Sequence, residues 1–267
     1  MAECSFSREL WQQPNAVSRT YAGSAEADAE HYQPKVNLAS GEVTGAEALI
    51  RCNDPRTGLV SPAQFIPILE EIGLIYEVGR WALPKAIAEY LRWRDAGLAG
   101  VRIAVNMSPL QLRSRGFVAQ IERAIAVDPQ AAAGLELEIT ESLLMEDVAH
   151  SIAPLRAISA LDVTIAIDDF GTGFSSLSHL SKLPVHTLKI DRSFIADMTA
   201  SPQGLALVST VVYLAHSLNL KSIAEAVETV EQSGLLRLLK CNEMQGYLFN
   251  KPLPSDVFEA RFLQKQP

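Results

Sequence analysis

From Tyr32 onward, two kinds of segment alternate along the chain. Short runs rich in β-branched and apolar residues are separated by longer amphipathic stretches. This pattern is typical of βα units that build a parallel sheet. The candidate strands are 43–50, 101–106, 135–140, 163–168, 187–190 and 221–225, with weaker ones near Tyr32 and Gln245. The pattern therefore predicts about eight strands.

No internal linker, low-complexity tract or sequence repeat divides the 267 residues. Eight strands that alternate with helices at this length predict an α/β fold, a TIM-like (β/α)8 barrel, which typically needs about 250 residues. A doubly wound open sheet is the alternative, but its usual phosphate-binding fingerprint is missing. We expect an irregular N-terminal segment over 1–30, the barrel over 31–263 and a short tail over 264–267.

Composition excludes several classes of protein. Hydrophobic residues make up 48% of the chain, enough for a large core, and the net charge of −8 disfavours binding to polymeric nucleic acid or to anionic membranes. The three cysteines are far apart and form no CxxC pair, which predicts a reducing compartment. The longest apolar run, 205–215, is too short to span a bilayer. We therefore expect a soluble, cytoplasmic protein without membrane insertion.

Polar side chains recur at the ends of the predicted strands. In 135–140 the leucines and the isoleucine share one face and the polar residues share the other. In a barrel the apolar face meets the outer helices, so the polar face points into the lumen. The residues predicted at the C-terminal rim are Glu47, Asn106, Glu138, Asp168, Lys189, Glu225 and Gln245, with Asp169 beside Asp168. Barrel enzymes carry their active sites at this rim.

This set of side chains predicts a metal site. Five carboxylates on one rim raise one another's pKa unless a cation compensates them. All candidate ligands are oxygen donors, which suits Mg²⁺ or Mn²⁺, and two ions roughly 3.5–4 Å apart that share Asp168 would bind a phosphodiester and activate a water. A single strand-end carboxylate is more often a helix cap or a surface ion pair, but so many at corresponding positions favour a site. Lys189 is either a structural ion-pair partner or a group that helps to deprotonate or orient the attacking water, because a nearby ammonium favours hydroxide.

Eight motifs carry a family resemblance. They are Tyr32-Gln33-Pro34, Glu47-Ala48-Leu49 with Arg51, Val105-Asn106-Met107-Ser108 with Gln111, Glu138-Ile139-Thr140-Glu141, Asp168-Asp169-Phe170-Gly171-Thr172-Gly173-Phe174-Ser175-Ser176, Leu188-Lys189-Ile190-Asp191-Arg192-Ser193-Phe194, Ala224-Glu225 with Glu228, and Gln245-Gly246-Tyr247. At these residues the sequence resembles the EAL-domain family of cyclic di-GMP phosphodiesterases, over roughly 32–258. The resemblance implies a variant (β/α)8 barrel whose first strand is antiparallel to its neighbours.

The resemblance also implies a role for each matching residue. One metal ion would be held by Glu47, Asn106, Glu138 and Asp168, and a second by Asp168, Asp169 and Glu225. Lys189 and Gln245 would contact the attacking water, so the catalytic set is Lys189, Glu47, Asp168 and Gln245. The substrate would be bound by Gln33, Leu49, Arg51 and Gln245. Glu141 would anchor the loop 169–176, which in the family links the active site to the dimer interface.

The implied activity is metal-dependent hydrolysis of cyclic di-GMP to linear pGpG, which lowers the level of this bacterial second messenger. The implied partners are a second copy of the chain in a homodimer and sensor domains or regulatory proteins. Two alternatives stand beside this activity: a catalytically impaired EAL domain that senses cyclic di-GMP, and a structural scaffold, which would leave the rim carboxylates unexplained.

The sequence departs from the family pattern at four positions. Cys52 replaces a tryptophan, and Ala226 replaces the glycine that follows Glu225, where the added methyl group would shift that ligand. Asp28 and Glu30 stand where the family has apolar residues, so we expect a shortened or irregular first strand.

Overall fold

The computed structural model describes residues 30–54, 58–97, 101–146, 148–173 and 177–262. The predicted irregular segment 1–30 and the tail 264–267 lie outside these residues, except that Glu30 begins the first strand. Among the described helices, none combines the length and the apolar character that crossing a membrane requires.

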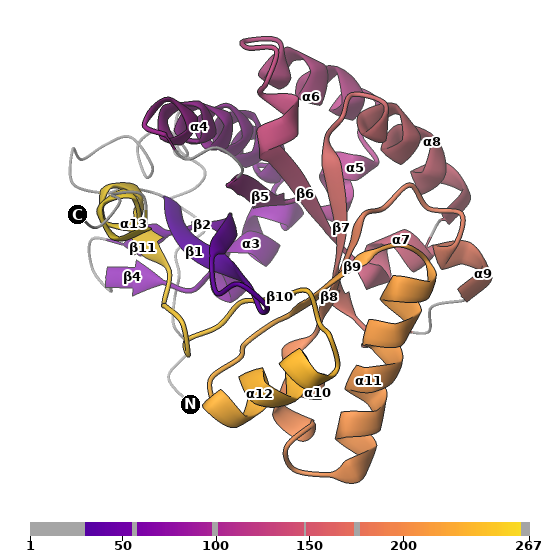
Figure 1. The fold of residues 1–267 in the computed structure, drawn as a ribbon. Coiled ribbons are helices and arrows are strands. Elements are labelled where there is room, and N and C mark those ends of the chain that lie inside the picture. Colours follow the sequence, from indigo (N-terminus) through magenta and orange to yellow (C-terminus); the bar gives the residue numbers. More distant parts are fainter. Residues whose placement is uncertain (1–29, 55–57, 98–100, 147, 174–176, 263–267) are drawn as a thin grey trace, which may run out of the picture.

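Eight strands form a closed barrel, which confirms the predicted fold class (Figure 1). In chain order they are β1 (Glu30–Asn37), β2 (Val43–Ile50), β5 (Arg102–Asn106), β6 (Leu135–Thr140), β7 (Thr164–Phe170), β8 (Thr187–Ile190), β9 (Lys221–Ala224) and β10 (Glu243–Met244). Neighbouring strands from β2 through to β10 are parallel. The alternation in the sequence therefore predicted the ends of six barrel strands to within about two residues, and it predicted β1 and β10 only by their approximate place.

The first strand runs against both of its neighbours. β1 is antiparallel to β2 on one side and to β10 on the other, where Val36 pairs with Met244 and closes the barrel. The expected irregularity is present as a register shift between Lys35 and Val36, but the strand is eight residues long and is not shortened. A further short strand, β11 (Leu253–Pro254), pairs with the start of β1.

Helices surround the strands (Figure 1). They are α3 (Pro62–Glu71), α4 (Ile75–Asp95), α5 (Pro109–Leu112), α6 (Phe117–Ile125), α7 (Glu141–Glu146), α8 (Val148–Ser159), α9 (Leu177–Leu180), α10 (Arg192–Asp197), α11 (Pro202–Ser217), α12 (Val230–Leu238) and α13 (Ser255–Phe262), with a 3-10 turn at Ala132–Gly134. Capping residues set several starts; Thr229 and Gln232, for example, form a capping box at α12.

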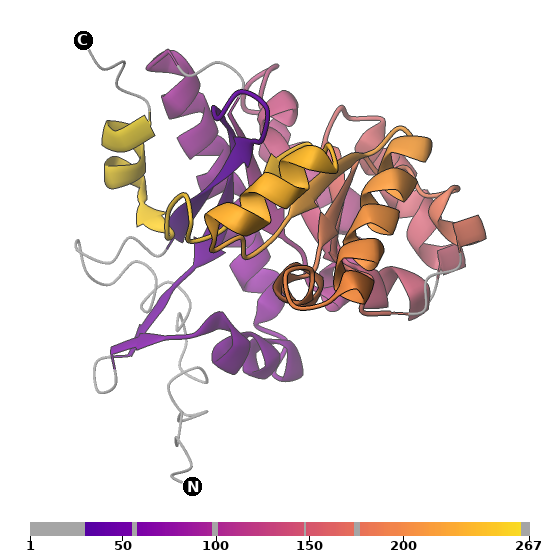
Figure 2. The same ribbon diagram turned by 60° about the horizontal axis from the view of Figure 1, so that its bottom comes forward.

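The main core lies between the barrel and its helices. Ile103, Leu137 and Ile165, on the outward faces of consecutive parallel strands, are fully buried in it. A hairpin of β3 (Cys52–Asp54) and β4 (Gly58–Val60) extends away from the barrel beside α3 (Figure 2). Cys52 belongs to a smaller apolar cluster with side chains of α3 and α4. The strands thus keep their apolar face outward and leave the lumen to polar residues.

Candidate active site

The predicted rim residues meet at one end of the barrel because parallel strands end there together. Glu47 lies in β2, Asn106 ends β5 and Glu138 lies in β6. β7 supplies Asp168 and Asp169, and β8 supplies Lys189. Glu225 and Gln245 each lie one residue beyond the last residue of their strand, β9 and β10.

The ammonium group of Lys189 lies at the centre of this set and is fully buried. Its Nζ is 2.6 Å from Glu138 Oε2, 2.7 Å from Glu225 Oε1, 3.1 Å from Asp168 Oδ1 and 3.6 Å from Glu47 Oε2. Four carboxylates from four different strands or strand ends therefore contact one cation. Among the described acidic residues, the mutual spacing that a shared metal ion requires is found for Asp168, Asp169 and Glu225 only.

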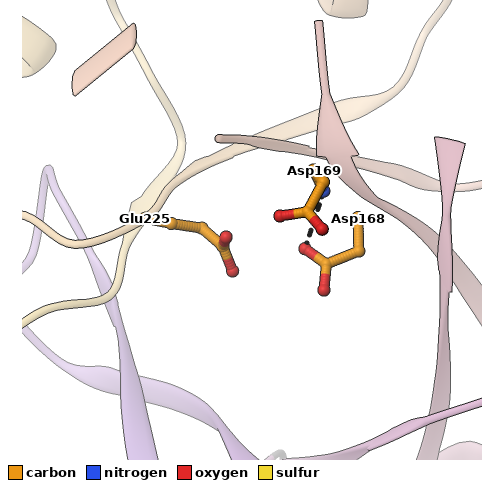
Figure 3. A group of neighbouring side chains, drawn as sticks. All are labelled: Asp168, Asp169 and Glu225. Atoms are coloured by element: carbon orange, nitrogen blue, oxygen red, sulfur yellow. Dashed lines mark hydrogen bonds between the residues drawn. The ribbon is translucent and has the colours of Figure 1, made fainter. Parts of the chain in front are cut away.

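Three carboxylates form an open group beside Lys189. One oxygen from each of Asp168, Asp169 and Glu225 lies within 4.8 Å of the other two. Figure 3 shows Glu225 pointing toward the aspartate pair from the opposite side, and the amide of Asp169 donating to Asp168 Oδ1 over 3.0 Å. Asp169 has a φ of 53°, a left-handed conformation that aspartate tolerates better than most residues. The donor set and its spacing fit a hard divalent cation.

A chain of amides connects the other predicted ligands. Asn106 Nδ2 donates to Glu47 Oε1 over 2.7 Å, and Gln245 Nε2 donates to Glu47 Oε2 over 2.6 Å. The same Gln245 nitrogen is 3.0 Å from Gln33 Oε1. Gln245 Oε1 is buried and has no hydrogen-bond donor among the described residues. A buried acceptor without a partner is expected to bind a water or a cation, so this oxygen also fits a metal-bound water.

Both oxygens of Glu138 are occupied by ammonium groups. Oε1 is 2.7 Å from Lys35 Nζ, and Oε2 is 2.6 Å from Lys189 Nζ. Lys35 also pairs with Glu136 Oε1 over 2.5 Å, so a second charged layer lies in the lumen. Our sequence reasoning did not assign Lys35 and Glu136 to the site. The alternation of strand faces could have indicated Glu136, since it shares a face with Glu138.

Lys189 and Lys35 determine which of the rim carboxylates stay ionised. Burial acts to raise the pKa of Glu138, but Lys189 and Lys35 outweigh it and lower this pKa to about 2. Burial likewise acts to lower the pKa of Lys189, and the carboxylates around it raise this pKa well above its ordinary value. Glu138 and Lys189 therefore form a stable buried ion pair.

The remaining carboxylates have more negative charge around them than the lysines neutralise. Burial, followed by repulsion from neighbouring acids, raises the pKa of Asp169 to about 6 and also raises the pKa of Glu47. Burial raises the pKa of Glu225 to about 8, although Lys189 opposes the shift. Groups in this state favour uptake of a proton or of a cation, and a divalent ion would satisfy several of them at once.

A cavity of about 400 Å³ opens beside these carboxylates. It is lined by Gln33, Glu47, Leu49, Arg192, Glu225, Ala226, Glu228, Gln245, Gly246 and Tyr247. Gln33, Leu49 and Gln245, three of the four predicted substrate contacts, line this cavity. Arg51 is not in this lining: its Nη1 donates to the carbonyl of Ile50 over 3.1 Å, and burial lowers its pKa. Arg192 and Tyr247 line the cavity but were not predicted as site residues.

Glu141 holds the loop that follows β7. Its Oε2 accepts hydrogen bonds from the amides of Gly171, over 2.6 Å, and Gly173, over 3.4 Å. Gly171 has a φ of 104°, and a Cβ there would lie 2.7 Å from the ring of Phe194, so only glycine fits. The part of the predicted loop at 174–176 lies outside the described residues.

The fold and the site together define a TIM-like barrel with an oxygen-donor, metal-type site at the carboxyl ends of its strands. The chain belongs to the EAL domain family, which matches residues 21–252 and confirms the resemblance seen in the sequence.

Relatives and solved structures agree with this assignment. The chain is 44% identical over 230 residues to the bifunctional diguanylate cyclase/cyclic di-GMP phosphodiesterase MucR of Pseudomonas aeruginosa, covering 86% of this chain and 34% of MucR. It is 41% identical to the cyclic di-GMP phosphodiesterase NbdA of the same organism, covering 86% of this chain and 29% of NbdA. The chain thus spans about a third of the length of these relatives. A structure of the MucR phosphodiesterase from P. aeruginosa in complex with c-di-GMP superimposes with a TM-score of 0.83 at 43% identity, covering 86% of this chain and 93% of that one.

Proposed function

We propose that this chain is a cyclic di-GMP phosphodiesterase that hydrolyses the cyclic dinucleotide to linear pGpG. The observation that carries the proposal is the convergence of Glu47, Glu138, Asp168 and Glu225 on one point of the rim, marked by Lys189 Nζ. The names of the relatives support the substrate, since MucR and NbdA are both called cyclic di-GMP phosphodiesterases.

The cofactor in this proposal is Mg²⁺ or Mn²⁺, as two ions. Glu47, Asn106, Glu138 and Asp168 would hold one, and Asp168, Asp169 and Glu225 the other. When bound, such ions neutralise the charge that develops on the phosphoryl oxygens and lower the pKa of a bound water. Each oxygen of Glu138 already accepts from one ammonium group, so an ion would bind through a remaining lone pair.

The protein side chains position the water and the proton. Water attacks phosphorus, the bond between phosphorus and one 3′ oxygen breaks, and that oxygen leaves with a proton. Gln245 Oε1, which has no other partner among the described residues, is placed to accept a hydrogen bond from the water. The ammonium of Lys189 favours the hydroxide form of that water and orients it.

Substrate contacts follow from the cavity lining. Gln33 and Leu49 would contact the nucleotide, and Gln245 both nucleotide and water. Arg51 would grip a phosphate after giving up its bond to the Ile50 carbonyl. We further propose a cytoplasmic location and a homodimer joined to sensor domains or regulatory partners.

The direct test is an assay of the purified protein with Mn²⁺ and cyclic di-GMP, with separation of the products by chromatography. We expect a single product, pGpG, and its loss on addition of EDTA. Glu47→Gln should lower kcat about 100-fold or more, because Glu47 contacts Asn106, Gln245 and Lys189 together. The matched control is Glu77→Gln on the exposed face of α4, which should behave as the wild type.

A sensor that binds without cleaving is the second candidate, and one observation favours it. Ala226, directly after Glu225, has a φ of 51°, a conformation that disfavours residues with a Cβ. Strain at this position would weaken the placement of Glu225. Calorimetric binding of cyclic di-GMP with no pGpG formed in Mn²⁺ or Mg²⁺ would establish the sensor and reject the enzyme.

A further inference from the structure

The cavity beside the rim carboxylates has an uneven charge. Glu47, Glu225 and Glu228 contribute three carboxylates to its lining, and Arg192 is the one cationic side chain among its described lining residues. An anionic ligand would therefore meet repulsion over most of this cavity. Metal ions can offset the repulsion at Glu47 and Glu225, but Glu228 lies outside the predicted ligand sets.

The backbone of Arg192 is fixed by a helix cap, while its guanidinium has no hydrogen-bond or ion-pair partner among the described residues. It is the first residue of α10, and the preceding Asp191 caps this helix by accepting a hydrogen bond from the amide of Ser193 over 2.9 Å. The cap fixes the point from which the Arg192 side chain extends. The side chain is exposed, and no carboxylate or carbonyl within the described parts of the chain pairs with its guanidinium. Arg51, by contrast, already donates to Ile50.

The sequence position of Arg192 relates it to the reaction centre. It follows Lys189 by three residues at the junction of β8 and α10, and Asp191 between them is among the groups that raise the pKa of Asp169. Arg192 thus borders the acidic cluster from the β8 side, whereas Gln33 and Leu49 border the cavity from β1 and β2. A ligand that fills the cavity reaches Arg192 and the acidic cluster at the same time.

We propose that Arg192 binds the phosphate of the cyclic dinucleotide that is not cleaved, and thereby selects substrates with two phosphates. This inference rests on the proposed function. The phosphate to be cleaved is directed to the acidic cluster and its divalent ions. The other keeps its negative charge in a cavity that contains Glu228, so it needs a cation of its own, and a planar guanidinium can bind two phosphate oxygens at once.

The test compares one diester with two phosphates and one with a single phosphate. Arg192→Gln and Arg192→Lys are assayed with cyclic di-GMP and with bis(4-nitrophenyl) phosphate in Mn²⁺. For Arg192→Gln we expect kcat/KM for cyclic di-GMP to fall about ten-fold or more further than kcat/KM for the single-phosphate diester, with the loss expressed in KM. Arg192→Lys should recover part of the loss, since it keeps the charge but not the planar fork.

Binding and a control arginine complete the experiment. Calorimetry of cyclic di-GMP in Ca²⁺ should show an affinity at least about ten-fold weaker for Arg192→Gln than for the wild type. Arg237→Gln, an exposed arginine on α12, should match the wild type in every measurement. Equal losses for both diesters, or unchanged cyclic di-GMP affinity, would overturn the role of Arg192. If the wild type binds cyclic di-GMP but does not cleave it, the proposed phosphodiesterase activity is rejected, and the affinity comparison still tests the role of Arg192. If the wild type does not bind cyclic di-GMP, both proposals are rejected.

Discussion

Glu30 is a carboxyl group buried at the start of β1 in a largely apolar setting. It borders a cavity of about 420 Å³ between the barrel wall, α3 and α4. Its Oε2 accepts a hydrogen bond from the Tyr32 hydroxyl over 2.7 Å, but no described residue donates to Oε1. Burial raises the pKa of Glu30 from 4.5 to about 7.

The shifted pKa of Glu30 predicts a pH-dependent stability. Because the folded state binds this proton more tightly than the unfolded state, the contribution of Glu30 is greatest below pH 4.5, falls as the pH rises from 4.5 to about 7, and is level above that. The total change is about 3 kcal/mol in the free energy of unfolding. Glu30→Gln, which stays neutral, should remove this part of the slope and unfold at a higher denaturant concentration than the wild type at pH 8.

The comparison between variants isolates Glu30 from the rim carboxylates, which titrate in the same range. Denaturation of wild type, Glu30→Gln and the exposed control Glu77→Gln is followed between pH 4.5 and 8 in EDTA. The control should follow the wild-type curve. A difference between wild type and Glu30→Gln that stays constant across this range would contradict a raised pKa for Glu30.

At the scale of elements, one side chain joins the start of α7 to the loop after β7. Glu141 is 1% exposed and accepts from two loop amides, Gly171 and Gly173. Asp169, a predicted ligand, lies in β7 two residues before Gly171. A carboxylate that accepts from these partly buried amides contributes more than a neutral acceptor would, and its removal leaves the donors without this partner.

We therefore predict that Glu141→Ala lowers the free energy of unfolding by about 3 kcal/mol and weakens Mn²⁺ binding. The local signature is hydrogen exchange: the amides of Gly171 and Gly173 should exchange faster, while amides of β6 keep their relative protection. Glu122→Ala on the exposed face of α6 serves as the control and should change neither quantity. Unaltered exchange at both glycines in Glu141→Ala would show that Glu141 does not anchor the loop.

The elements that periodicity predicted correctly are those whose faces differ chemically. Leu135–Thr140 alternates apolar and polar residues, and its predicted ends match the structure. β7 extends beyond its predicted end to Phe170, because its pairing with β8 shifts register after Ile167. The β3–β4 hairpin carried no recognised signal, and it packs on α3 and α4 through Cys52, a tertiary contact that local sequence does not encode.

Within the site, the alternation of strand faces predicted which side chains point into the lumen, but not which of them form ion pairs or hydrogen bonds with one another. Glu47, Glu138 and Asp168 all lie within 3.6 Å of Lys189 Nζ, since corresponding strand ends meet in a barrel. The partnership of Glu138 with Lys35 depends on the approach of β1 to β6 across the lumen, which requires the closed fold. Arg192 was not predicted for a similar reason. Many helices begin with charged residues, and only its position in the cavity lining, which requires the folded structure, marks Arg192 as a site residue.

At the scale of the whole molecule, the barrel concentrates negative charge in its upper lumen. The chain carries a net charge of −8, and the rim holds Glu47, Asp168, Asp169 and Glu225 around one ammonium. The raised pKa values of Glu225, about 8, and of Asp169, about 6, show that folding brings these groups together at the expense of their ionisation. A divalent ion bound only by the folded barrel removes this penalty and stabilises the fold.

Metal addition should therefore raise the thermal midpoint, and by an amount that depends on pH. At 100 times the dissociation constant the gain is about 2.7 kcal/mol, or roughly 5–10 °C for a domain of this size. At pH 5.5 the gain should shrink, since below about pH 8 Glu225 and below about pH 6 Asp169 take up protons that compete with the ion. Scanning calorimetry with Mn²⁺ at pH 8.5 and 5.5 measures both effects, with NaCl at equal ionic strength and the double variant Asp169→Asn/Glu225→Gln as controls. An equal rise in NaCl, or a full rise in the double variant, would mean that the stabilisation is general screening rather than coordination at the rim.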